Sequence, residues 1–154
     1  MLERLSRAQI AAIIPHAGAM CLLDGVLEWN AAKIRCCSRS HRDPANPLRS
    51  GGCLPAVCGI EYAAQAMAVH GGLAGNAGSR PKAGYLASVR DVTCTRPRLD
   101  DMEGDLVVDA EQLMGDETRV IYQFTVTVGV VEVLSGRATV VLDAAAIRSE
   151  GAAA

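Results

Sequence analysis

The chain has 154 residues, a length that fits one domain and excludes two full enzyme domains. Half of the residues are hydrophobic and 21% are charged, which indicates a globular protein and excludes a disordered chain. Only 3% are aromatic, which argues against a stacking platform for single-stranded nucleic acid. We expect a single domain over residues 1–148 and a flexible tail over residues 149–154.

The net charge of −2 conceals an uneven distribution along the chain. Residues 30–98 hold ten Lys and Arg against three Asp and Glu, whereas residues 100–117 hold eight acidic residues and no Lys or Arg. This asymmetry predicts separate basic and acidic surfaces, although solvated loops and sheet faces would also produce it. The residues that we consider for binding an acidic partner are Arg80, Lys82, Arg90, Arg96 and Arg98.

The six cysteines lie mostly in apolar surroundings and lack the even spacing of secreted disulfide scaffolds. We therefore expect free thiols in a reducing cytoplasm. Cys53 and Cys58 would need two further ligands for zinc, and the chain has only three His, so no metal is expected. The apolar run at residues 10–14 is too short for a signal peptide, so no export is expected either.

The first fifty residues alternate between regular segments and breakers. Residues 2–14 carry apolar positions at helical spacing, and Pro15 ends the predicted helix. Residues 21–29 and 33–40 are rich in strand formers and predict a β-hairpin. Residues 41–52 contain two Pro and two Gly and are expected to form a flexible loop.

The segment at residues 54–69 predicts a buried helix, because it is small or apolar on nearly all sides. Pro55 suits the first turn, and the glycine pair at 71–72 is expected to stop the helix. Glu61 and Gln65 are the exceptions to its apolar character. At sixteen residues with a central carboxylate, this helix is a poor membrane span, which needs about 20 apolar residues.

After a glycine-rich linker at residues 71–84 the sequence favours β-structure. Two strands, one long apolar helix and four further strands predict a curved antiparallel sheet around a central helix, the α+β arrangement of the hot-dog fold. A six-stranded sheet of this kind leaves a long edge strand, so we expect two copies to pair into a homodimer. The four later strands are expected at residues 85–95, 105–114, 119–128 and 133–142.

Glu61 is the first candidate for chemistry, because a carboxylate in an apolar helix is costly unless it is neutralised, paired or in a cleft. Gln65 follows four residues later on the same helical face, so the pair is suited to holding a substrate hydroxyl and its proton. The alternative is that Glu61 is a buried hydrogen-bonding anchor or a dimer contact.

Three histidines are available as partners of that carboxylate. His70 lies nine residues beyond Glu61 and therefore on the opposite face of the helix, so we set it aside. His41 lies in the loop before the helix, and His16 follows Pro15 before the first strand of the hairpin. Either is a candidate base, although a histidine in such a position is more often an ordinary surface or hydrogen-bonded residue.

Short motifs lie in order along most of the chain. The first are Ile14-Pro15-His16 and Leu22-Leu23-Asp24, and the predicted central helix carries Leu54-Pro55-Ala56-Val57 followed by Glu61 and Gln65. Arg96-Pro97 and Gly104-Asp105 follow at a strand turn. These motifs resemble, in the same order, those of the 3-hydroxyacyl-acyl-carrier-protein dehydratases of the hot-dog superfamily. Residues 59–68 resemble more closely a divergent subgroup of predicted dehydratases associated with aryl-polyene biosynthesis.

The chain departs from that family at the position of the catalytic base. The family's histidine stands fourteen residues before the helix Glu, where this chain has Pro47. His41 lies six residues earlier, and His16 matches a family position not usually assigned the base. Ala56 replaces the Gly whose backbone amide, by resemblance, polarises the thioester carbonyl; Ala retains that amide.

The resemblance implies dehydration of a 3-hydroxyacyl thioester in fatty-acid, polyketide or polyene biosynthesis. Glu61 would be the acid and the Ala56 amide the carbonyl donor, with Pro55 and Gln65 beside the substrate. The substrate would be carried on the phosphopantetheine of an acyl carrier protein, and the protein itself would need no cofactor. Three interpretations remain open: an active dehydratase with a relocated histidine, a catalytically incomplete subunit that supports an active hot-dog partner, and a thioesterase. The protein would form a homodimer or a heterodimer with another hot-dog dehydratase.

Overall fold

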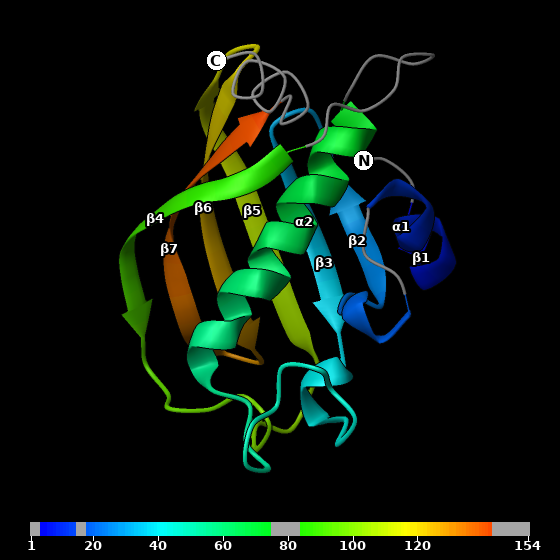
Figure 1. Cartoon of the computed structure of the whole chain (residues 1–154), viewed down its shortest axis with the longest axis vertical. Helices are drawn as coiled ribbons and strands as arrows, with labels where there is room; N and C mark the ends of the chain where they lie inside the picture. The colour runs from blue at the N-terminus through cyan, green and yellow to red at the C-terminus, as the bar shows by residue number, and fades with distance from the viewer. Residues whose placement is uncertain (1–3, 15–17, 75–83, 143–154) are drawn as a thin grey trace, which may run out of the picture.

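The computed structural model describes residues 4–14, 18–74 and 84–142 of the chain. These residues form one antiparallel sheet with the strand order β1-β2-β3-β5-β6-β7-β4, and the long helix α2 crosses one face of it (Figure 1). The short helix α1 lies beside the β2 end of the sheet. This arrangement confirms the predicted α+β fold class.

The strands and helices of the described residues have the following bounds. The strands are β1 (Leu5–Ser6), β2 (Gly25–Trp29), β3 (Lys33–Ser38), β4 (Gly84–Cys94), β5 (Leu106–Gly115), β6 (Arg119–Val128) and β7 (Val131–Leu142). The α-helices are α1 (Arg7–Ile13) and α2 (Gly59–Ala74), and the 3-10 turns are η1 (Gly18–Met20), η2 (Ser40–Arg42) and η3 (Ala56–Cys58).

The core lies between α2 and the inner face of the sheet. Alternate residues of β6, among them Tyr122, Phe124 and Val126, are buried, as their period-two pattern predicts. Gly59 lets the first turn of α2 approach the sheet closely, because a Cβ there would lie 2.7 Å from Cδ2 of Leu134. The sheet therefore fixes where α2 begins.

The N-terminal helix is shorter than residues 2–14. Leu5–Ser6 pairs with β2 as a seventh strand, and α1 begins only at Arg7. Ser6 is the N-cap: its hydroxyl accepts from the Gln9 amide N–H, and the Gln9 side chain accepts from the Ser6 N–H. The prediction of six strands was wrong by this short edge strand, which the helical spacing concealed.

The central helix starts later and ends later than residues 54–69. The glycine pair at 71–72 does not stop it, and α2 continues to Ala74. Gly72 lies against α1, where a Cβ would be 2.4 Å from Cγ2 of Ile13. The glycine therefore permits a close contact between two helices instead of ending one of them.

Candidate functional site

The start of α2 is tied to the connection between β4 and β5. The Leu54 N–H donates to Oδ1 of Asp100 at 2.8 Å, and the Leu54 carbonyl accepts from the Leu99 N–H at 2.8 Å. The Ala56 N–H donates to the Pro97 carbonyl at 3.1 Å. We call residues 97–100 the strap, because these bonds hold the Leu54-Pro55-Ala56 segment against it.

The Ala56 amide is thus already engaged, which corrects the expectation that it faces a substrate carbonyl. The next residue, Val57, is 54% exposed, and among the described residues its N–H has no hydrogen-bond partner. Backbone N–H groups at the start of a helix are suited to stabilising negative charge on an oxygen. Val57, not Ala56, therefore offers the amide donor at this end of α2.

Asp100 is the residue of the strap that contacts two guanidinium groups. Its side chain is 6% exposed, forms an ion pair with Arg98 and lies 4.0 Å from the Arg49 guanidinium. The hydrogen bond from Arg98 holds the pKa of the Asp100 carboxyl well below its usual range, and the Leu54 N–H acts in the same direction. A permanent carboxylate therefore anchors the segment that leads into α2.

Glu61 lies half-buried in the first turn of α2, two residues beyond Gly59. Gln65 is fully buried one turn later, as the four-residue spacing requires. The Gln65 amide forms hydrogen bonds with the backbone of η1 and of the segment after it. Its Oε1 accepts from the Leu22 N–H at 2.9 Å, and its Nε2 donates to the Met20 carbonyl at 2.7 Å. Gln65 thus holds a neighbouring segment of the chain in place.

Tyr62 organises the loop that leads up to the Leu54-Pro55-Ala56 segment. Its hydroxyl is buried, lies 2.7 Å from Oγ of Ser40 and accepts from Nδ2 of Asn46 at 2.9 Å. Asn46 also donates to the Ser40 carbonyl. Sequence pattern alone does not predict this cluster, although a single Tyr in a helix of small residues is a visible signal.

His41 is not the mobile loop histidine that we expected. It lies in η2, is fully buried, and its Nε2 donates to the Met102 carbonyl at 3.1 Å. Its Nδ1 is buried with no partner among the described residues. Burial lowers the pKa of His41, so the ring is neutral. The exposed Pro47 occupies the family's base position, and no imidazole of the described residues is accessible there.

The other two histidines are placed differently. His70 lies near the end of α2, where Nε2 donates to the Asn30 carbonyl at 2.8 Å and Nδ1 accepts from the Tyr122 hydroxyl at 2.7 Å. These contacts agree with setting His70 aside, since Glu61 is at the other end of the helix. His16 lies outside the described residues.

Three of the five basic candidates are described. Arg98 forms an ion pair with Asp100. Arg96 is exposed beside the strap, and Arg90 is exposed on β4. Arg80 and Lys82 lie outside the described residues. All six cysteines are free thiols, and the described part of the chain holds no cluster of three or more possible metal ligands. None of its helices is long and apolar enough to cross a membrane.

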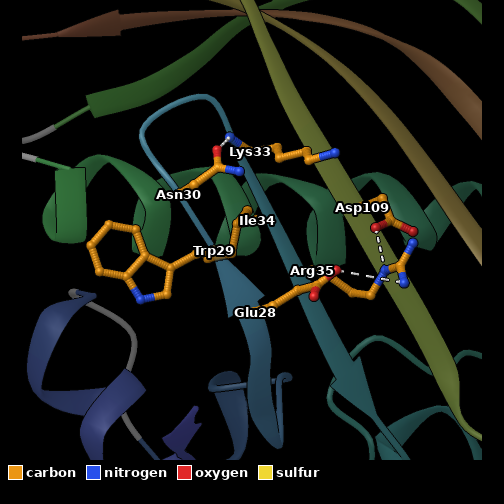
Figure 2. A pocket seen from close by; sticks show the side chains of 7 residues that line it. All are labelled: Glu28, Trp29, Asn30, Lys33, Ile34, Arg35 and Asp109. Atoms are coloured by element: carbon orange, nitrogen blue, oxygen red, sulfur yellow. Dashed lines mark hydrogen bonds and ion pairs between the residues drawn. The ribbon is translucent and has the colours of Figure 1, made fainter. Parts of the chain in front are cut away.

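A pocket of about 270 Å³ lies elsewhere on the molecule, by the β2–β3 hairpin (Figure 2). Its wall includes Trp29, and the Arg35 guanidinium donates to Asp109 at 2.7 Å and lies 3.8 Å from Glu28. With Lys33, the lining holds two basic and two acidic residues, so its charges balance. Because the charges balance and Glu61 is not among the lining residues, we do not assign this pocket to the candidate site.

Comparisons with solved structures place the chain in the hot-dog class. It is similar to a chain of the dehydratase heterocomplex ApeI:P from Xenorhabdus doucetiae, with 24% identity, 86% of this chain and 90% of that chain covered, and a TM-score of 0.75. It is also similar to thioesterase HI1161 from Haemophilus influenzae, with 12% identity, 90% of each chain covered and a TM-score of 0.65.

A mutant of thioesterase PA1618 from Pseudomonas aeruginosa shares the fold as well, with 11% identity, 89% of this chain and 93% of that chain covered, and a TM-score of 0.62. No curated protein sequence gives a significant match. Residues 8–148 match the ApeP-like family, described as ApeP dehydratase. The chain therefore belongs to the ApeP-like dehydratase family, which confirms the resemblance found in the sequence.

Proposed function

We propose that the protein is one subunit of a 3-hydroxyacyl-[acyl-carrier-protein] dehydratase and that a second hot-dog subunit supplies the base. One observation carries the proposal: Glu61 lies at the start of α2, but the position that the resemblance assigns to the base is Pro47, and the nearest described loop histidine, His41, is fully buried with its Nε2 bonded to the Met102 carbonyl. The membership of a solved relative in a dehydratase heterocomplex supports such an arrangement.

The reaction divides between the two subunits as follows. The base of the partner removes a proton from C2 of the thioester, and the electron pair forms the C2–C3 double bond as the C3–O bond breaks. Glu61, in its acid form, protonates the departing hydroxyl, which leaves as water. Negative charge that develops on the thioester oxygen is stabilised by a backbone N–H at the start of α2, and Val57 offers that donor.

The substrate in this proposal is an acyl chain on the phosphopantetheine of a carrier protein, in fatty-acid, polyketide or polyene biosynthesis. The exposed Arg96 immediately precedes the strap, and the strap is hydrogen-bonded to the segment that leads into α2. Its charge favours an acidic carrier domain near Glu61, and such attraction weakens with salt. The protein requires no cofactor of its own for this chemistry.

The test compares Glu61→Gln with a matched control, Glu111→Gln, whose carboxylate is exposed on β5. Dehydration of a 3-hydroxyacyl carrier substrate is followed by mass spectrometry, for the protein alone and in equimolar mixture with a second hot-dog dehydratase subunit from the same organism. We expect turnover only in the mixture, and a loss of about 100- to 10,000-fold in Glu61→Gln but not in Glu111→Gln.

Other outcomes would decide between the remaining interpretations. If the protein alone is fully active and His41→Ala or His16→Ala abolishes that activity, the base belongs to this chain and not to a partner. Release of free carrier thiol from a simple acyl substrate would identify a thioesterase. Full activity of Glu61→Gln would show that Glu61 is a structural residue and would overturn the assignment.

A further inference from the structure

The pocket by the β2–β3 hairpin lies at the far end of α2 from Glu61, because the carbonyl of its Asn30 accepts from His70, near the end of that helix. Its volume is about 270 Å³ (Figure 2). Sites for small molecules usually measure about 300 to 1,000 Å³. The pocket is therefore separate from the candidate site and suits a ligand at the small end of that range.

The turn that shapes this pocket is held by hydrogen bonds. Oδ1 of Asn30 accepts from the N–H groups of Ala32 and Lys33 at 2.8 and 2.9 Å, and the Asn30 N–H donates to the Lys33 carbonyl at 2.8 Å. The bond from His70 ties the same residue to α2. A wall that is fixed in advance loses little freedom when a ligand binds, which favours affinity.

The charged side chains of the wall form a negative end and a positive end. Arg35 stands between two carboxylates: its Nε donates to Asp109 at 2.7 Å, and its Nη1 lies 3.8 Å from Glu28 (Figure 2). These three groups together carry one negative charge. Lys33 lies two residues before Arg35 on the same face of β3, is exposed, and forms no ion pair within the described residues. The pocket thus offers one unpaired charge of each sign.

Trp29 supplies the apolar part of the wall. Its ring is half-buried, and its Nε1–H is buried without a hydrogen-bond partner among the described residues. An aromatic or aliphatic group laid against this ring would bury apolar surface on both sides of the contact. The wall therefore favours a ligand that has an apolar side chain besides its charges.

The balance of charges selects against a ligand of one sign. An anion that approaches Lys33 also meets Glu28 and Asp109, and a cation that approaches these carboxylates also meets Lys33 and Arg35. Repulsion of the wrong ligand contributes to specificity as much as attraction of the right one. A molecule that carries both charges gains at both ends of the pocket.

We propose that this pocket binds a small zwitterion with an apolar side chain, of the chemical class of the aromatic α-amino acids. The carboxylate of the ligand pairs with Lys33, its ammonium group pairs with Glu28 and Asp109, and its side chain lies against Trp29. The proposal concerns a second site and does not rest on the proposed function.

Trp29 is the only Trp of the chain, so tryptophan fluorescence reports on this pocket directly. The full chain is titrated with L-phenylalanine and with two probes that each lack one charge, phenylpropanoate and phenylethylamine. From the usual binding efficiency of small ligands, L-phenylalanine should bind with a Kd of about 2 mM. Exposed ion pairs contribute little, so each of the other probes should bind only about two- to fivefold more weakly.

Two variants assign the charges. Lys33→Gln should weaken the binding of L-phenylalanine about two- to fivefold and should not weaken that of phenylethylamine, which has no carboxylate. Glu28→Gln should weaken L-phenylalanine by a similar factor and should not weaken phenylpropanoate, which has no ammonium group. The matched control is Arg137→Gln, an exposed cation on β7 outside the pocket, which should change none of these affinities.

Saturation-transfer NMR of the same mixtures detects a ligand that leaves the Trp29 fluorescence unchanged. The inference is overturned by the absence of a saturable signal in both measurements, by equal affinity for the three probes, by unchanged binding in both pocket variants, or by an equal loss in the control. None of these measurements involves turnover, so their failure leaves the role of Glu61 to its own test.

Discussion

Gln65 offers the sharpest test of how the site is built, because substrate binding and structural anchoring predict different results for it. Replacement by Met keeps the length of the side chain but removes both hydrogen bonds to the 20–22 segment. The Leu22 N–H would then be buried without a partner, while the carbonyl of the exposed Met20 can bond to water. Together these losses should lower the free energy of unfolding by about 2 to 3 kcal/mol.

Urea denaturation of Gln65→Met should show a lower midpoint with an unchanged slope. For a chain of this size, a loss of 2 to 3 kcal/mol corresponds to a fall in melting temperature of about 4 to 12 °C. The matched control is Gln123→Met, an exposed position on β6, where we expect a change below about 0.5 kcal/mol. A Gln65→Met protein of wild-type stability but with a raised KM would refute the anchoring role and support direct contact with substrate.

Three further predictions follow from particular positions. Gly59→Ala places a Cβ 2.7 Å from Cδ2 of Leu134, so the Leu134 side chain must shift. The free energy of unfolding should fall by about 1 to 3 kcal/mol in the same urea assay. Burial lowers the pKa of both His41 and His70, so the unfolded chain takes up these protons first as pH falls below about 6.5. Each histidine should lower the free energy of unfolding by up to about 1.4 kcal/mol per pH unit in that range, and His70→Gln should remove only its own share of the slope measured by urea denaturation at several pH values. We expect an acyl chain bound beside Glu61 to pass Ala68, which is exposed on α2 seven residues further on and therefore on the same face of the helix. Ala68→Leu should then lower kcat/KM at least about tenfold for long chains and leave short ones unchanged, and an equal effect on both would exclude that path.

The sequence predicted best what depends on local pattern. Alternation of buried and exposed residues placed β6 at its observed bounds, Arg119–Val128, and the four-residue spacing correctly put Glu61 and Gln65 on one side of α2. The choice of Glu61 over His70 also depended only on helical periodicity, which adjacent residues determine.

What the sequence could not reveal depends on contacts between distant segments. The partners of Gln65 lie 43 and 45 residues away, and the Ala56 amide meets Pro97 across the strap. The glycine pair at 71–72 was interpreted as a helix stop because its contact with Ile13 is invisible to any local window. The roles of these residues follow from the packing of the folded chain.

The strap has a consequence for how the chain tolerates changes in length. Connections between strands usually accept inserted residues, and the exposed turn at Val130 between β6 and β7 should do so. The connection between β4 and β5 is different, because residues 97–100 make three backbone-directed hydrogen bonds to residues 54–56 in a fixed register. One added residue there would displace the carbonyl of Pro97 or the carboxylate of Asp100 from its donor. Tags, reporter insertions and new chain ends for circular permutation therefore belong at the β6–β7 turn and not in the strap.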